Sequence, residues 1–253
     1  MVQQREVETA PAHGLGSLMS DLIEVNSVTF AYRKPKTNIF RELSLSFKDG
    51  QITCILGHNG AGKTTLLKLL YGILRQQAGQ IRIDRNRVPS YRHIFFLSDR
   101  FGINQELSLR QNLIFRCQLF RVDVDAVLSH SYIRDYKLLK HLDTPTGKLS
   151  AGYFTRANIV AGLVFGPSLL MLDEPTNSID PATRELLMHT LRQQRESGVS
   201  VLLVTHDLDF AYAVGDRLLV IDEGEIVVDD SQPRTSDLED FRQRYVHFTE
   251  QKE

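Results

Sequence analysis

Three features that would each define a class of protein are scarce or missing in this sequence. Only two cysteines, Cys54 and Cys117, occur among 253 residues, too few for a disulfide framework, so we expect a reducing compartment. The 30 basic side chains almost balance the 31 acidic ones, which argues against a protein that coats nucleic acid through bulk positive charge. The longest uncharged apolar stretch, residues 159–172, is shorter than the roughly 20 residues of a membrane-spanning helix. The sequence therefore predicts a globular protein without a transmembrane helix.

The two ends of the chain differ from its middle. Residues 1–20 mix charged residues with proline and glycine and contain no apolar run of signal-peptide length, so we expect a flexible N-terminal lead. Residues 231–253 are highly charged, and Phe241 and Tyr245 are four residues apart, the spacing of one helical face. This predicts a charged C-terminal helix that docks on one larger domain at 21–230.

Strand and helix signals alternate along that larger domain. Short apolar or alternating runs predict strands at 22–32, 43–47, 52–56, 81–83, 94–97, 169–172 and 199–204, followed by an edge hairpin at 217–228. Apolar residues at helical spacing occupy 63–74, 184–195 and a long insertion from 108 to about 141. The order is typical of an α/β nucleotide-binding architecture with one helical insertion.

A glycine-rich motif joins the strand predicted at 52–56 to the helix predicted at 63–74. It fits the pattern G-x-x-x-x-G-K-[ST] and consists of Gly57, His58, Asn59, Gly60, Ala61, Gly62, Lys63, Thr64 and Thr65. Glycines let backbone N–H groups converge on phosphate oxygens, and the amino end of a helix adds partial positive charge. In this pattern Lys63 reaches the terminal phosphates and the Thr64 hydroxyl binds Mg²⁺. The motif predicts a phosphate-binding loop.

Two adjacent carboxylates end the apolar run at 169–172. Asp173 is placed to hold Mg²⁺ through water, and Glu174 to orient or deprotonate an attacking water. Taken alone, the pair would also fit an ordinary strand terminus. A phosphate loop needs an acidic partner at the end of another buried strand, so the two motifs together predict hydrolysis of a nucleoside triphosphate.

In this order the motifs resemble those of the ATP-binding cassette of ABC transporters, over about residues 22–230. Residues 149–153 read LSAGY and resemble the family's LSGGQ signature. Residues 177–180 follow the acidic pair as the family's D-loop does, and residues 205–207 end the next strand at the position of its switch histidine. The resemblance implies an α/β fold with a P-loop NTPase core, a mixed parallel sheet, an antiparallel β subdomain and an inserted α-helical subdomain at about 104–165.

The resemblance also implies the roles of four further residues. Ser150 and Gly152 begin a helix whose amino end faces the γ-phosphate of ATP bound to another cassette. His206 contacts the γ-phosphate, and Tyr32 stacks on adenine. Without the family, Ser150 would serve only as a helix N-cap, His206 as a polar residue at a strand end and Tyr32 as an edge-strand aromatic. The implied cofactors are ATP and Mg²⁺.

Two departures from the family's pattern concern this site. Asp99 stands where the family's Q-loop normally has glutamine. A carboxylate accepts from a metal-bound water but cannot donate as an amide does, so we expect Asp99 to join Thr64 and Asp173 around Mg²⁺. In the signature, Ala151 replaces glycine and Tyr153 replaces glutamine, and alanine narrows the accessible backbone conformations only slightly.

The family resemblance implies an ATP-hydrolysing subunit that powers transport through a separate transmembrane permease subunit. A second nucleotide-binding subunit, identical or related, completes each ATP site by head-to-tail closure, and no nucleic acid takes part. The permease docks in a groove between the helical insertion and the strand that precedes Asp99. We expect a cytoplasmic protein, peripheral on the inner face of the cell membrane, and residues 107–113 resemble those of exporter ATPases.

Two other classes of protein carry a phosphate loop. Soluble members of the same superfamily carry two cassettes or a long coiled coil within the cassette, whereas this chain has one phosphate loop and no sustained heptads. A small-molecule kinase would not need the signature, the D-loop and His206 in this order. A soluble ABC-type ATPase that acts without a membrane subunit is the main alternative.

The position of Asp99 generates a testable prediction. An extra carboxylate beside Asp173 and Glu174 adds negative charge that a divalent cation must neutralise. We expect the parent chain to hydrolyse ATP but to depend more strongly on Mg²⁺ than Asp99→Gln does. A Mg²⁺ titration of the ATPase rate of both proteins measures this, and identical curves would reject the prediction.

Overall fold

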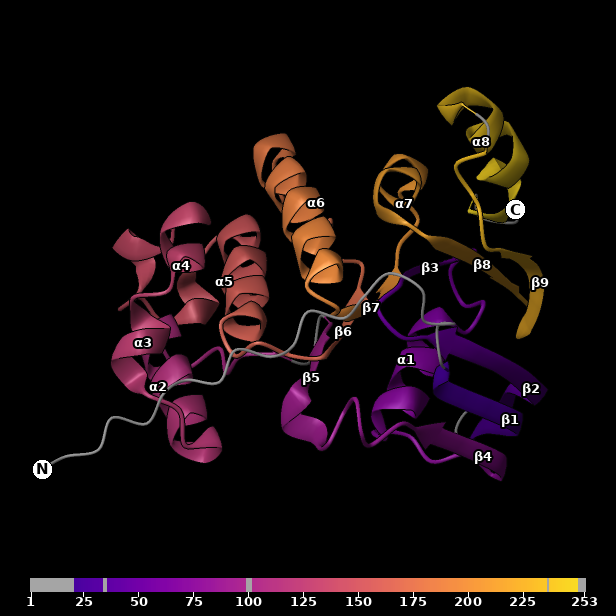
Figure 1. Cartoon of the computed structure of the whole chain (residues 1–253), viewed down its shortest axis with the longest axis horizontal. Coiled ribbons are helices and arrows are strands. Elements are labelled where there is room, and N and C mark those ends of the chain that lie inside the picture. The colour runs from indigo at the N-terminus through magenta and orange to yellow at the C-terminus, as the bar shows by residue number, and fades with distance from the viewer. Residues whose placement is uncertain (1–20, 34–35, 99–101, 236, 250–253) are drawn as a thin grey trace, which may run out of the picture.

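The computed structural model describes residues 21–33, 36–98, 102–235 and 237–249, which are organised around a six-stranded sheet (Figure 1). The strand order is β5–β6–β7–β3–β8–β9; the strands from β5 to β8 run parallel, and β9 pairs antiparallel with β8. The strands are β3 (Ile52–Leu56), β5 (Ile94–Leu97), β6 (Leu169–Asp173), β7 (Ser200–Val204), β8 (Arg217–Asp222) and β9 (Glu225–Asp230). The predicted edge hairpin is confirmed by β8 and β9.

Successive residues of the central strands pack into two different layers. In β3, Cys54 packs among the helices on one side of the sheet, and Ile55 packs toward α1 (Lys63–Tyr71) and a second sheet on the other side. Leu170 and Met171 of β6 alternate in the same way. Because both faces are covered, each position of these strands favours an apolar side chain. This is why they stand out in the sequence as short uninterrupted apolar runs.

The second sheet is antiparallel and three-stranded, in the order β2–β1–β4. Its strands are β1 (Asp21–Arg33), β2 (Lys36–Lys48) and β4 (Ala78–Ile83), all longer than the predicted runs at 22–32, 43–47 and 81–83. The pairing of β1 with β2 continues from Asp21 opposite Lys48 to Arg33 opposite Lys36. Backbone pairing therefore extends past the apolar residues from which the strands were predicted.

Helices cover the face of the main sheet that lies away from α1 (Figure 1). They include α5 (Ala151–Leu163), α6 (Pro181–Glu196), α7 (Leu208–Val214) and the C-terminal α8 (Leu238–Tyr245), in which Phe241 and Tyr245 are buried. Asp180 caps α6 by accepting from the N–H of Thr183, and Pro181 is the first residue of the helix. Among the described residues, no helix combines the length and the apolar character that crossing a bilayer requires.

The predicted long insertion is divided into separate helices, α2 (Leu109–Phe120), α3 (Val124–Leu128) and α4 (Ser131–Asp135). Each begins at a side-chain cap, from Ser108, Asp123 and His130 respectively. The helix predicted at 63–74 ends earlier, at Tyr71, because Gly72 adopts φ +90° and its N–H bonds to the carbonyls of Leu69 and Lys68. Caps and left-handed residues, rather than the apolar spacing, set these boundaries.

The contact between α5 and β5 generates a stability prediction. A Cβ atom on Gly162 would lie 2.2 Å from the ring of Phe95, so Gly162→Ala must displace that ring. Overpacking costs about 1–3 kcal/mol, which exceeds the ~1 kcal/mol that alanine gains in helix propensity. We expect a net loss of about 1 kcal/mol in the free energy of unfolding, measured by urea denaturation. In the double variant with Phe95→Leu, the loss should be smaller than the sum of the single losses; strict additivity would contradict this explanation.

Candidate nucleotide site

The phosphate loop connects the end of β3 to the start of α1. Gly57 has φ +145°, and a Cβ atom there would lie 2.2 Å from the carbonyl oxygen of Ile221 in β8. Gly62 has φ +111° and directly precedes the helix, as its N-cap. Both positions therefore require glycine, the first for close approach of two backbones and the second for its left-handed conformation.

Lys63 is buried at the centre of the loop. Its Nζ donates to the carbonyl oxygens of Gly57, at 2.5 Å, and His58, at 2.9 Å. Burial lowers the pKa of Lys63, and the nearby charges of Glu174 and Asp173 act against that shift. The Lys63 ammonium group is thus held by two neutral carbonyl acceptors, and the two carboxylates are near enough to influence it. Phosphate oxygens bound beside it would add negative charge that compensates for the burial of the ammonium group.

Thr64 and Asp173 meet where α1 begins and β6 ends. The Thr64 hydroxyl donates to Oδ1 of Asp173 at 3.0 Å. Mg²⁺ prefers hard oxygen ligands at 2.0–2.1 Å in octahedral geometry, in which adjacent ligands are about 2.9 Å apart. The two oxygens are therefore close enough for both residues to hold one Mg²⁺, with Asp173 directly or through water. Within the described part of the chain, no group of three or more His, Cys, Asp or Glu side chains could hold a metal by itself, so phosphate and water would complete the coordination.

Glu174 and His206 form the next pair along the same edge of the sheet. Nδ1 of His206 lies 2.9 Å from Oε2 of Glu174, and because a carboxylate only accepts, Nδ1 carries the hydrogen. Glu174 has φ +50°, an unusual value for a residue with a Cβ atom, and its N–H donates to the carbonyl of Val204 in β7. This turn of the backbone aims the Glu174 carboxylate at His206.

A cavity of about 260 Å³ lies above these residues. Of the predicted site residues, it is lined by Tyr32, Asn59, Gly60, Gly62, Lys63, Thr64, Thr65, Asp173 and the predicted catalytic residue Glu174. The hydroxyl of Tyr32 lies 3.2 Å from Oγ1 of Thr65, and Phe30 packs edge-on against the Tyr32 ring at 5.0 Å. Tyr32 therefore lies at the border of the phosphate loop, on the side of the antiparallel sheet.

Several predicted residues lie beside this cavity rather than in its wall. His58 turns toward the hairpin, where its Nε2 lies 2.8 Å from Oδ1 of Asp222, and Ala61 is buried. Ser150 caps α5 by accepting from the N–H of Tyr153 at 3.4 Å, and both Ser150 and Ala151 are exposed. The amino end of α5 thus faces solvent. Asp99 lies outside the described residues.

Sequence reasoning missed the residues that position the predicted ones. Arg184 of α6 forms two hydrogen bonds, each 2.9 Å, with the carboxylate of Asp207, which also caps α7 directly after His206. Arg156 of α5 pairs with Asp180, and Thr183 and Arg156 together hold the pKa of Asp180 far below its usual range. These ion pairs join residues more than 20 positions apart, and the local sequence carries no sign of them.

A family model described as "ABC transporter" matches residues 40–177, more than half of the chain. The chain belongs to the ABC transporter family. A second model, described as "AAA domain, putative AbiEii toxin, Type IV TA system", matches the shorter range 153–210. The resemblance drawn from the motifs is confirmed: the chain is an ABC transporter ATPase, which binds ATP and hydrolyses it to drive transport.

Curated relatives of this ABC ATPase are ATP-binding proteins with several substrates. It is 29% identical over 238 residues to a tyrosine transport ATP-binding protein of Clostridioides difficile, covering 85% of this chain and 94% of that one. It is 34% identical over 194 residues to the Nod factor export ATP-binding protein I of Burkholderia orbicola, covering 74% of this chain and 64% of that one. The match thus leaves about a third of the Nod factor protein unaccounted for.

Solved structures share the fold. An ATP-binding subunit of an ABC transporter superimposes with a TM-score of 0.74 at 22% identity, covering 90% of this chain and 94% of that one. The cbiO1 protein of Clostridium perfringens, part of the ABC transporter complex cbiONQ, superimposes with a TM-score of 0.67 at 25% identity, covering 89% and 91%. The predicted α/β ABC ATPase fold is confirmed.

The position of Tyr32 generates a prediction about nucleotide affinity. Stacking of a base on an aromatic ring contributes about 1–3 kcal/mol, so we expect Tyr32→Ala to weaken ATP binding roughly tenfold or more. Tyr32→Phe keeps the ring and loses only the contact with Thr65, so its affinity should stay within about twofold of the parent. Calorimetry with ATP and with inorganic triphosphate, which has no base, separates base stacking from contacts to the phosphates. An equal loss of affinity of Tyr32→Ala for both ligands would rule out stacking.

Proposed function

We propose that this ATPase drives transport through a separate membrane-spanning subunit by ATP-dependent, head-to-tail closure with a second cassette. The observation that carries the proposal is the contrast between the two halves of the site. The phosphate loop, Asp173 and Glu174 converge on one cavity, whereas the cap of α5 at Ser150 is exposed to solvent. A helix amino end favours anions, so this exposed end suits the γ-phosphate of ATP held by another cassette, identical or related.

Each site residue then has a definite task. Lys63 and the loop 57–65 bind the phosphates of ATP, and Ser150 and Gly152 of the second cassette close the site. Thr64 and Asp173 would hold Mg²⁺, with the carboxylate of Asp99 joining them, and the bound ion would supply positive charge opposite the phosphates. Glu174 orients the attacking water and accepts its proton, while His206 positions the Glu174 carboxylate through their 2.9 Å contact.

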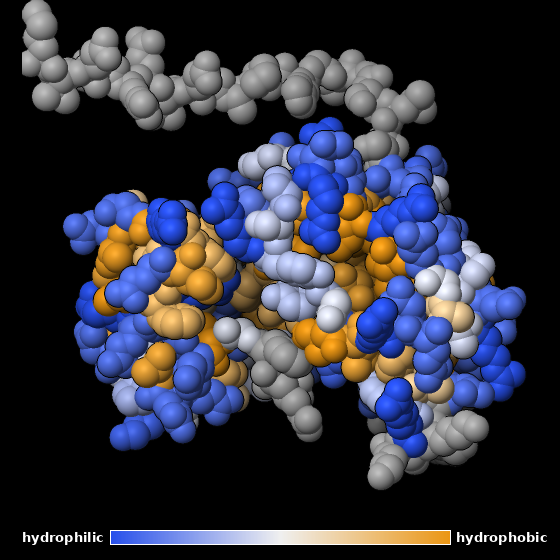
Figure 2. Space-filling model, turned by 90° about the horizontal axis from the view of Figure 1, so that it is seen from below, coloured by the Kyte–Doolittle hydropathy of each residue, from blue (hydrophilic) through white to orange (hydrophobic). Residues whose placement is uncertain are grey.

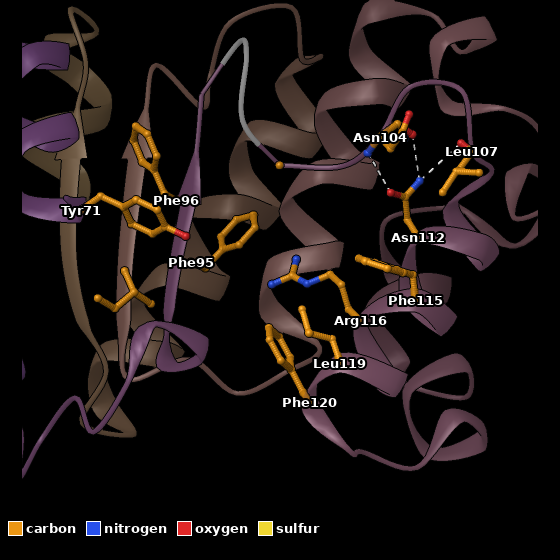
Figure 3. Close-up of a pocket in the computed structure, with 12 residues that line it drawn as sticks. Tyr71, Phe95, Phe96, Asn104, Leu107, Asn112, Phe115, Arg116, Leu119 and Phe120 are labelled. Carbon is orange, nitrogen blue, oxygen red and sulfur yellow. Dashed lines mark hydrogen bonds between the residues drawn. The ribbon is translucent and has the colours of Figure 1, made fainter. Parts of the chain in front are cut away.

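The membrane subunit would dock in the groove between the helical insertion and β5. A cavity of about 470 Å³ lies between β5, the end of α1 and α2, and its wall includes the aromatic side chains of Tyr71, Phe95, Phe96, Phe115 and Phe120 (Figure 3). Figure 2 shows apolar surface on the lobe at the left of the view, where Figure 1 places α2 and α3. An exposed apolar surface of this kind is typical of a protein interaction site. Such docking would place the ATPase on the cytoplasmic face of the membrane.

We propose export as the direction of transport. The run at 107–113 resembles exporter ATPases, and several relatives with 32–34% identity are named as Nod factor export proteins. Relatives at 28–29% identity include an energy-coupling factor transporter ATP-binding protein and a spermidine/putrescine import protein. Reconstitution with the membrane subunit in vesicles distinguishes the directions, because export from the cell appears as ATP-dependent uptake when the cassettes face outward.

Glu174 provides the test of head-to-tail closure. Glu174→Gln should bind ATP but hydrolyse it too slowly to reopen, so we expect ATP to convert the variant from a monomer to a dimer. Light scattering on a sizing column measures both states. Adding Ser150→Arg should abolish the dimer, because a bulky cation would block the exposed end of α5. A monomer with and without ATP would contradict the mechanism.

A further inference from the structure

The proposed docking groove contains a cation among aromatic rings. Phe95 and Phe96 of β5 line one wall, and Phe115, Leu119 and Phe120 of α2 line the other (Figure 3). Phe115 and Leu119 are 60% and 64% exposed, although both are large apolar residues. They are four residues apart and so project from one face of α2, next to the groove. This wall is suited to the apolar face of another helix.

Arg116 is the basic residue between them, and its guanidinium group is held in a defined place. Its carbon atom lies 4.8 Å from the ring centre of Phe165, 5.5 Å from that of Phe120 and 5.6 Å from that of Phe95. One of its nitrogens donates to the carbonyl oxygen of Ala161 in α5 at 2.7 Å. Figure 3 shows the group extending from α2 across the groove toward Phe95. Contacts from three elements therefore orient it before any partner arrives.

The charge of Arg116 has no acidic partner among the residues that the structure describes. No described carboxylate lies within 4 Å of its nitrogens, whereas Arg110 on the same helix is paired with Asp143 at 2.6 Å. Burial lowers the pKa of Arg116, although the group stays charged at any physiological pH. A partly buried cation that the described residues contact only through rings and one carbonyl is costly, and a carboxylate would offset that cost.

We propose that Arg116 binds a carboxylate on an amphipathic helix of the membrane subunit, an inference that rests on the proposed docking function. Charge complementarity selects an Asp or Glu, since the planar guanidinium fork matches a carboxylate and four of its five N–H donors are free of the Ala161 bond. The apolar wall of the groove favours apolar residues elsewhere on the same helix. The proposed partner is therefore an amphipathic helix with one acidic residue on its apolar face. A second copy of this chain is a poorer occupant, because the lining includes no residue of the phosphate loop or of the signature.

Binding of the membrane subunit to Arg116 variants tests the inference. The probe is the membrane protein that co-purifies with the tagged chain from detergent-solubilised membranes, identified by mass spectrometry and then expressed alone. Removing one partner of a desolvated charge pair weakens binding strongly, so we expect Arg116→Gln to lower the affinity at least tenfold and Arg116→Lys to lower it less. Arg110→Gln, which removes the same charge outside the groove, should stay within twofold. The ATPase rate of each isolated variant should match the parent.

Charge reversal identifies the partner group. Arg116→Glu should lose binding, and changing one Asp or Glu in the cytoplasmic loops of the membrane subunit to Arg should restore it. If Arg116→Gln binds weakly but no reversal restores binding, the occupant is not a protein carboxylate and the inference is overturned. If Arg116→Gln binds normally while Leu119→Asp does not, the partner binds in the groove but does not need Arg116. The inference about Arg116 then fails, and the proposed function stands. If the parent chain captures no membrane protein, the proposed function itself fails.

Discussion

The parallel register of β3, β6 and β7 decides where the chemistry of this ATPase takes place. Val204 of β7 pairs with Ile55 of β3 on one side and with Asp173 of β6 on the other, so the three strands end at the same level. The phosphate loop, Glu174 and His206 all leave the sheet from that common edge. A shift by one residue would turn Asp173 toward the opposite face of the sheet, into the helix-covered layer where Leu170 and Leu172 pack, and separate it from Thr64. Long-range strand pairing is therefore the condition for the catalytic chemistry.

The nucleotide site and the docking groove differ in polarity but share structural elements. Phe95 lines the groove from β5, and it pairs with Leu170 of β6, the strand that ends in Asp173. Hydrogen bonds and ion pairs define the first region, whereas aromatic contacts define the second. Interiors this closely packed transmit small displacements instead of absorbing them. A change in one region can thus reach the other through adjacent strands.

The features that could be predicted from the sequence are those in which a local residue pattern is compatible with only one local structure. The phosphate loop and the apolar strands belong to this group, because glycine spacing and two-sided burial leave few alternatives. The end of α1 at Tyr71 was missed, since the apolar spacing continues to Leu74 while Gly72 ends the helix. The pairs Arg184–Asp207 and His58–Asp222 were also missed, because only tertiary packing brings their members together.

The length of α5 gives its two ends a mechanical relation. At 1.5 Å per residue, its 13 residues extend over about 20 Å. One end begins at the exposed Ser150, and near the other end the carbonyl of Ala161 holds Arg116, with Gly162 pressed against Phe95. Because α5 is rigid and is held near Ala161, a small rotation of the helix about that end would displace its amino end by a larger distance. A partner that displaces the wall of the groove would then move the Ser150 end of α5 toward or away from a neighbouring molecule, without any bending of the helix.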